Sequence, residues 1–232
     1  MTMACQVPTD TPSSFNIQPM HKIATTILLA ATALVATSQD FKGLVNIKEK
    51  DSTIIVDLMY AKPDNFVGEK MYNFSEAYLH PKAAEAVKKA NSMLQAEHPD
   101  LRLIIYDAAR PMRVQQKMWN KVKGTAQQNY VSNPANGGGL HNYGLAVDVS
   151  IADCNGDTLP MGTLVDALTP ISHIDKEQEL VRSKKITTEA ASNRALLRNV
   201  MKKAGFKPLR SEWWHFNYTT RADARKNYKV IK

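Results

Sequence analysis

A histidine and an aspartate lie at the start of one predicted strand. His141 precedes residues 145–151, in which apolar residues alternate with Ala146, Asp148 and Ser150, so the acid faces away from the apolar side. An acid between two small side chains packs against nothing of its own size, and it either caps a turn or binds a ligand. Imidazole and carboxylate groups are both ligands of divalent metals. The pair therefore indicates a metal site, although a lone aspartate on a strand is more often a surface residue.

A second acid and histidine lie in the aromatic segment 211–218. Glu212 and His215 are three positions apart, with two tryptophans between them. Residues three apart point to opposite faces of a regular strand, so both can serve one site only if Glu212 lies on the approach to the strand or on a bulge. An aromatic wall excludes water and raises the pKa of a carboxylate. The segment fits an acid/base beside a metal, and it fits equally a histidine satisfied in a Trp-rich core.

An arginine in a restricted backbone position is the third candidate. Arg110 follows the apolar segment 101–107 and precedes Pro111, which holds its backbone extended. Its guanidinium can therefore be aimed with little freedom, and a fixed cation near a metal suits a developing oxyanion. The alternative is a structural ion pair between Arg110 and Asp107.

The elements that must position these residues alternate irregularly between strands and helices. Period-two patterns and turn signals predict strands, and apolar spacing of three and four predicts helices. The strands are expected at 52–59, 101–107, 145–161 (a hairpin) and 211–218, and the helices at 82–97, 111–123 and 188–204. This order favours an α+β fold over a doubly wound parallel sheet.

Composition limits the class of protein. A chain of 232 residues is long enough for one globular domain with an appendage, and 44% hydrophobic with 22% charged residues exclude a disordered class. The net charge of +8 suits an anionic neighbour such as nucleic acid, phospholipid or a cell-wall polymer. The basic residues are scattered, so we favour a generic basic surface and expect no nucleic-acid partner.

The N-terminal region has the features of a targeting segment. Residues 23–36 are almost wholly apolar, follow a basic flank and lead into small residues, as in a secretory signal peptide. The run is shorter than the about 20 residues that a membrane span needs. We expect residues 1–38 to be an extension with a signal peptide at about 20–38, and residues 39–232 to be a single exported, periplasmic domain without a membrane span. An uncleaved membrane anchor is the alternative.

Five segments resemble, in order and spacing, the zinc D-Ala-D-Ala dipeptidases, the VanX-type branch of the D-alanyl-D-alanine metallopeptidase family. They are YAKPDNFVG at 60–68, YDAARPMR at 106–113, HNYGLAVDVS at 141–150, PMG to Asp at 160–166, and SEWWHF at 211–216. The resemblance covers about residues 44–218. It implies a small antiparallel sheet flanked by helices, similar to the hedgehog signalling domain, with zinc on the open face of the sheet.

The resemblance also implies a role for each candidate residue. His141, Asp148 and His215 would bind one zinc ion per chain. Glu212 would be the general acid/base toward a zinc-activated water, and Arg110 would stabilise the transition state.

Two further positions match residues that hold the free amino end of the substrate in such enzymes. These are Tyr60 and Asp166. The sequence departs from the family around His141, where Gly139 and Leu140 take the place of the usual serines and the usual arginine shortly after the histidine is missing, and at Ala109, which replaces an aromatic residue. The backbone N–H groups of Gly137–Gly139 could instead bind the substrate carboxylate as an anion nest.

The implied function is hydrolysis of the D-alanyl-D-alanine dipeptide in cell-wall peptide turnover, with this small dipeptide as the partner. One alternative is a D,D-carboxypeptidase acting on longer peptidoglycan peptides, which Asp166 disfavours because a longer substrate needs that end open. The other is a metal-bearing binding domain without catalysis. Glu212 and Arg110 disfavour it, since a pure binder needs no base.

Overall fold

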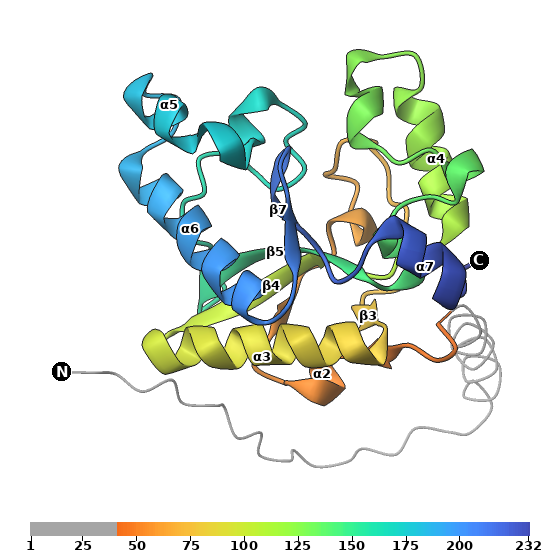
Figure 1. Ribbon diagram of the computed structural model, residues 1–232, viewed down its shortest axis with the longest axis horizontal. Helices are drawn as coiled ribbons and strands as arrows, with labels where there is room; N and C mark the ends of the chain where they lie inside the picture. Colours follow the sequence, from red (N-terminus) through yellow and green to blue (C-terminus); the bar gives the residue numbers. More distant parts are fainter. Residues whose placement is uncertain (1–40) are drawn as a thin grey trace, which may run out of the picture.

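The computed structural model describes residues 41–232, and a five-stranded sheet lies at its centre (Figure 1). The strand order is β2 (Ile55–Val56), β4 (Leu101–Asp107), β5 (Ala146–Asp153), β7 (Glu212–Asn217) and β6 (Lys207–Leu209). Three of the four pairings are antiparallel. The expected antiparallel sheet is wrong only at one edge, where β2 runs parallel to β4.

The three long helices lie where the apolar spacing predicts them. They are α3 (Pro81–Glu97), α4 (Met112–Val122) and α6 (Thr188–Lys203). Pro81 occupies the first turn of α3, where its missing N–H costs nothing. Thr187 caps α6 by accepting from the Ala190 N–H. Because α3 packs against β4 while α6 packs against β5 and β7, these two helices cover one side of the sheet.

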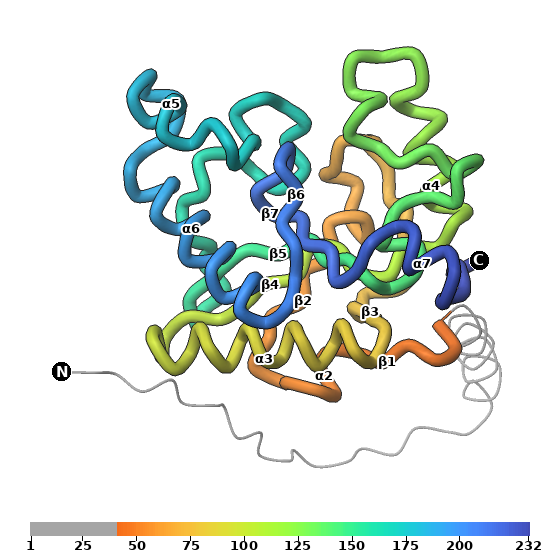
Figure 2. The backbone as a smooth tube through the Cα atoms, in the orientation of Figure 1, coloured from red at the N-terminus to blue at the C-terminus, as the bar shows by residue number. Residues whose placement is uncertain are grey.

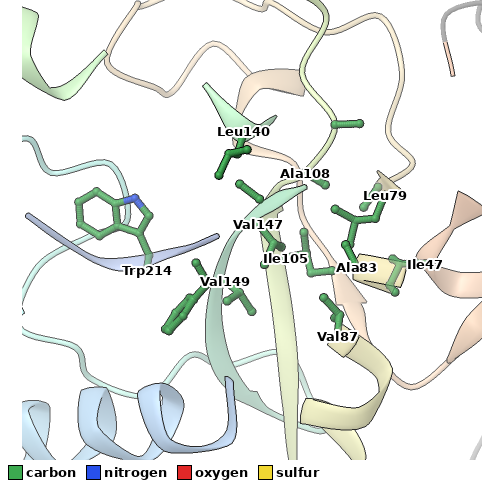
Figure 3. Close-up of a cluster of buried hydrophobic side chains, with 14 of the residues drawn as sticks. Ile47, Leu79, Ala83, Val87, Ile105, Ala108, Leu140, Val147, Val149 and Trp214 are labelled. Atoms are coloured by element: carbon green, nitrogen blue, oxygen red, sulfur yellow. The ribbon is translucent and has the colours of Figure 1, made fainter. Parts of the chain in front are cut away.

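The apolar face of β5 forms the centre of the core (Figure 3). Val147 and Val149 pack there with Ile105 of β4, Val87 of α3 and Trp214 of β7, all of them buried. The predicted alternation along β5 is therefore confirmed. It directs the intervening residue, Asp148, to the opposite side of the sheet.

Two predicted elements are shorter than expected. Only Ile55–Val56 of the segment 52–59 forms a strand, because the Asp51 carboxylate accepts from the N–H and hydroxyl of Thr53 and turns the chain there. The hairpin at 145–161 is reduced to β5 and a single bridge between Ala152 and Thr158.

The remaining elements are short. A two-stranded antiparallel sheet joins β1 (Val45–Asn46) to β3 (Tyr78–Leu79), and the other helices are α2 (Ile47–Lys50), α5 (Glu177–Arg182) and α7 (Arg221–Asn227). Six 3₁₀ turns complete the described chain: η1 (Met59–Ala61), η2 (Ala126–Tyr130), η3 (Pro134–Asn136), η4 (Leu140–Tyr143), η5 (Pro170–Ser172) and η6 (Ile174–Lys176).

The last residues of the chain lie beside α7 and α4, at the right-hand side of the view (Figure 2). Ile231 is buried, its N–H donates to the Asn142 carbonyl, and its carbonyl accepts from the Met112 N–H, both at 2.8 Å. The Arg113 guanidinium donates to the Lys232 carbonyl at 2.9 Å. The chain end thus joins the start of α4 to η4.

The predicted signal peptide lies outside the described residues. Within residues 41–232, no helix has the length and apolar character that crossing a bilayer requires.

Candidate functional site

Three side chains from separate elements converge on one point. Asp148 of β5 lies opposite His215 of β7 in the strand register, and η4 brings His141 beside them. Asp148 Oδ1 lies 3.0 Å from His215 Nδ1 and 3.3 Å from His141 Nε2, and the two imidazole nitrogens are 3.1 Å apart. These residues form a group that could hold a metal ion.

In each imidazole, one nitrogen faces the other ligands and the second nitrogen is hydrogen-bonded elsewhere. The partner of the second nitrogen determines whether the first one carries a proton. His141 Nδ1 lies 2.8 Å from the Ala108 carbonyl, which can only accept, so Nδ1 carries the proton and Nε2 is a bare acceptor. His215 Nε2 lies 2.9 Å from Asn217 Oδ1, which leaves His215 Nδ1 bare in the same way. Two lone pairs and a carboxylate oxygen then face one another, an arrangement that a metal cation between them would stabilise.

The donor set fits zinc. Bonds of about 2.0–2.1 Å in a tetrahedral site place two ligand atoms about 3.3 Å apart, close to the separations seen here. The electrostatic field agrees: burial alone lowers the pKa of His141, but the Asp148 and Asp107 carboxylates outweigh it and raise that pKa. A field that favours a proton on His141 also favours a metal cation beside it.

Glu212 reaches the same site because β7 is irregular. Leu209 of β6 pairs with Glu212, whereas the preceding Pro208 pairs with Phe216, so β7 contains extra residues between these pairs. This register shift at the first residue of β7 is the kind of irregularity that the sequence required if Glu212 and His215 share one site. It brings Glu212 Oε2 to 3.9 Å from His215 Nδ1. Only 8% of Glu212 is exposed, and this burial raises the pKa of its carboxyl to about 7.

Arg110 forms the ion pair with Asp107 that the sequence offered as one alternative, and it also lies beside the metal site. Its Nε and Nη2 donate to Asp107 Oδ2 at 3.0 and 2.5 Å, and its Nη1 donates to Gln115 Oε1 at 3.0 Å. The guanidinium also lies 3.9 Å from Asp148 Oδ2 and 5.2 Å from the Tyr60 ring centroid. The pair with Asp107 therefore holds Arg110 while it faces the metal site.

Tyr60 and Asp166, which are distant in the sequence, form a hydrogen bond. The Tyr60 hydroxyl donates to Asp166 Oδ2 at 2.5 Å. Burial raises the pKa of the Asp166 carboxyl to about 7. Asp166 also adopts a positive φ of 65°, which is a strained conformation for a residue with a Cβ.

All seven predicted site residues line one pocket of ≈ 560 Å³. They are Tyr60, Arg110, His141, Asp148, Asp166, Glu212 and His215.

Several residues of the site are not evident from the sequence. Gln115 and Asn217 hold Arg110 and His215 in place, and Tyr130 lines the pocket; Asp107, by contrast, was expected from the sequence as the partner of Arg110. Asn217 could have been found, because it lies two positions after His215 and so shares its strand face. Gln115 gives no such signal, since nothing in its segment relates it to Arg110.

The proposed glycine nest is wrong. The Gly137 and Gly138 N–H groups donate to the Pro134 and Asn133 carbonyls, and the Gly139 N–H donates to Asn142 Oδ1. All three donors are engaged inside their own loop and cannot bind a substrate carboxylate.

An α+β domain with a two-histidine, one-aspartate centre beside a buried glutamate has the equipment of a metal-dependent hydrolase. The model of the peptidase M15 family, described as D-Ala-D-Ala dipeptidase, matches residues 40–232. The chain therefore belongs to this family of metallopeptidases.

Proteins named D-alanyl-D-alanine dipeptidase are similar to this chain in three distant bacteria. The protein of Escherichia coli strain K12 is 33% identical over 76% of this chain and 85% of its own length. The Enterococcus faecium protein is 26% identical over 69% of this chain and 83% of its own length. The protein of Synechocystis strain PCC 6803 is 25% identical over 65% of this chain and 73% of its own length.

Proposed function

We propose that this protein is an exported, zinc-dependent dipeptidase that hydrolyses D-alanyl-D-alanine during cell-wall peptide turnover. Membership of the family supports the reaction class. The observation that carries the proposal is the convergence of His141 Nε2, His215 Nδ1 and Asp148 Oδ1 beside Glu212, in a pocket that Asp166 also lines. Export follows from the predicted signal peptide.

The three converging side chains would hold a single zinc ion. When bound, zinc polarises a carbonyl and lowers the pKa of water to about 7. The Ala108 carbonyl and Asn217 amide oxygen fix the ring orientations of His141 and His215, so both imidazoles are aligned before the metal arrives.

Glu212 is the proton carrier of the proposed reaction. A carboxyl with a pKa of about 7 is suited to accept a proton from the attacking water and to return it to the leaving amine near neutral pH. Its position in the bulge of β7 places it beside the metal ligands without making it one of them.

Arg110 faces the position where negative charge develops on the substrate oxygen. The Asp107 and Gln115 contacts fix the guanidinium before substrate binds, which is the condition for strong electrostatic stabilisation. Removing one such donor typically costs about 3–4 kcal/mol of transition-state stabilisation.

Asp166 and Tyr60 would bind the ammonium group of the dipeptide. A peptide with a blocked or extended N-terminus would leave the Asp166 carboxylate without its cation. This favours the dipeptidase over the D,D-carboxypeptidase, and the presence of Glu212 and Arg110 favours both over a binding domain without catalysis.

Free D-alanine release tests the proposal. The zinc-loaded protein is incubated with D-Ala-D-Ala, with its N-acetylated form and with a wall pentapeptide ending in D-Ala-D-Ala. We expect rapid cleavage of the free dipeptide alone. Efficient cleavage of the pentapeptide would show a carboxypeptidase instead, and no cleavage of any substrate would show a non-catalytic domain.

A further inference from the structure

A buried arginine outside the metal site makes its hydrogen bonds to one loop. Arg194 of α6 is 0% exposed. Its Nε donates to the Met161 carbonyl at 2.7 Å and its Nη1 to the Ile171 carbonyl at 3.1 Å. These two carbonyls lie near the two ends of the loop 160–172, which carries Asp166. Arg194 thus fastens both ends of the loop to α6.

The environment of Arg194 is costly for a cation. Glu177 is paired in a bidentate manner with Arg198 at 2.8 and 3.0 Å, and burial lowers the pKa of Arg194 to about 10. Within residues 41–232, Arg194 Nη2 is the only buried side-chain nitrogen or oxygen without a hydrogen-bond partner. A buried charge without a close counter-charge is generally less stable than an apolar side chain of similar volume. A role in stability alone therefore does not explain Arg194.

The loop that Arg194 holds also connects to the strand of Glu212. The Trp213 indole N–H donates to the Thr163 hydroxyl of the loop at 2.8 Å. Within the loop itself, the Ser172 hydroxyl donates to the Ala167 carbonyl at 2.6 Å. The Arg194 guanidinium lies 5.7 Å from the Trp213 ring centroid. One buried group therefore contacts both the loop of Asp166 and the residue that follows Glu212.

We propose that Arg194 is a positioning residue, which sets the place of Asp166 relative to Glu212 and so determines recognition of the ammonium end of the substrate. The strained backbone of Asp166 needs such support, because a loop free to relax would leave the left-handed conformation. This inference rests on the proposed role of Asp166 in binding the dipeptide.

Conservative and apolar replacements of Arg194 test the inference through the split between KM and kcat. For Arg194→Lys and Arg194→Met we expect KM for D-Ala-D-Ala to rise roughly tenfold, while kcat falls less than about threefold and zinc content stays the same. Arg198→Lys is the matched control, because Arg198 lies one turn further along α6 and pairs with Glu177 instead of the loop. It should leave both constants unchanged.

A double-mutant cycle distinguishes positioning from a general structural effect. In the Asp166→Asn background, Arg194→Lys should change KM by less than about twofold, because both substitutions remove the same interaction. Ser172→Ala, which loosens the loop without touching Arg194, should reproduce the rise in KM even if Arg194→Met fails to fold. If Arg194→Lys raised KM by the same factor in the wild-type protein and in the Asp166→Asn variant, the inference would be overturned.

The failure of this inference differs from the failure of the proposed function. If the wild-type protein releases no D-alanine from the dipeptide, the proposed function is wrong. If the wild type is active but Arg194→Lys behaves like Arg198→Lys, only the inference is wrong. Hydrogen exchange gives a readout independent of activity: amides 163–169 should exchange faster in Arg194→Lys than in Arg198→Lys, and equal protection would contradict the inference.

Discussion

Glu212 illustrates how burial determines the chemistry of one side chain. The same carboxyl in water would be ionised at neutral pH and a poor proton donor. In the folded chain, burial beside the metal ligands raises its pKa to about 7, so both protonation states are accessible during a reaction cycle.

The first prediction concerns Glu212→Gln. The amide keeps the shape of the side chain but cannot exchange a proton, so we expect turnover of D-Ala-D-Ala to fall by about 10²- to 10⁴-fold. Zinc content should stay at one ion per chain, because Glu212 is not among the converging ligands. Mass spectrometry of the metal and D-alanine release check this. Turnover within tenfold of the wild type would remove Glu212 from the mechanism.

The second prediction concerns the pH dependence of stability at Asp166. Burial raises its pKa to about 7 in the folded chain, against about 3.9 in an unfolded chain. The stability linked to this group is therefore complete below about pH 4 and is lost as the pH rises through about 7.

Asp166→Asn removes the loss of folding stability at high pH, because the amide does not ionise, and it keeps an acceptor for the Tyr60 hydroxyl. We expect the metal-free variant to be more stable than the metal-free wild type at pH 8, by about 1–3 kcal/mol after allowance for partial exposure of Asp166. The difference should shrink at pH 5. Urea unfolding at both values measures it, and a variant that is less stable at pH 8 would contradict the raised pKa.

At the scale of elements, the site depends on how β5, β7 and one loop meet. The register that places Asp148 opposite His215 also places Val147 opposite Phe216 in the core. A slip of one residue would turn Asp148 into the core and the valines out of it. The hydrophobic pattern and the metal ligands therefore specify the same alignment.

The third prediction concerns the loop 160–172. A Cβ at Gly162 would lie 2.7 Å from Ile186 Cγ2, whereas a Cβ at Gly156 would meet nothing within 4 Å. Both glycines have a positive φ, so replacement by alanine costs each about 1 kcal/mol of backbone strain. Only Gly162→Ala adds the clash, worth about 1–3 kcal/mol.

We therefore expect Gly162→Ala to shift the Asp166 loop and to raise KM for the dipeptide, with Gly156→Ala as the control. Unfolding free energies and steady-state constants compare the two variants. Equal KM values would show that the loop tolerates displacement without loss of substrate recognition.

The long elements were predictable because each carries its own periodic signal. The strand 101–107 and the helices that begin near 82, 111 and 188 are found within a residue or two of their predicted bounds. The strands β2 and β6 have two and three residues, too few to show a period, and they exist through pairing with their neighbours. No local signal in the sequence predicts that β2 pairs parallel to β4 at the edge of the sheet.

The features of the site likewise divide into those that local sequence signals predict and those that depend on long-range packing. His141, Asp148, Glu212 and His215 could be selected from residue type and motif, and the strand period required Glu212 to lie either on the approach to the strand or on a bulge. The support for Arg110 by Gln115 and the hydrogen bond from Tyr60 to Asp166 depend on long-range packing, which a single sequence does not contain. The glycine nest failed because the N–H groups of a loop are often used within that loop.

At the scale of the whole molecule, the metal would connect three separate parts of the chain. The ligands come from η4, β5 and β7, so zinc would bind the folded state and not the unfolded chain. Such binding stabilises by about 4 kcal/mol at a free concentration of 1,000 times Kd.

The fourth prediction follows from this connection. Removal of zinc by a chelator should lower the thermal midpoint, and added zinc should restore it. His215→Ala, which lacks one ligand, should melt like the chelated wild type and show no response to zinc. Thermal unfolding of the three samples checks this. A midpoint that zinc leaves unchanged in the wild type would exclude a shared metal.

The return of the chain end to η4 has a practical consequence. Ile231 holds the carbonyl of the residue after His141 and the first N–H of α4, and only Lys232 follows it in this sequence. Loss of these two hydrogen bonds would leave the Asn142 carbonyl, which adjoins His141, and the Met112 N–H without their partners. A variant at Ile231 that loses them would show reduced activity although no catalytic side chain had changed.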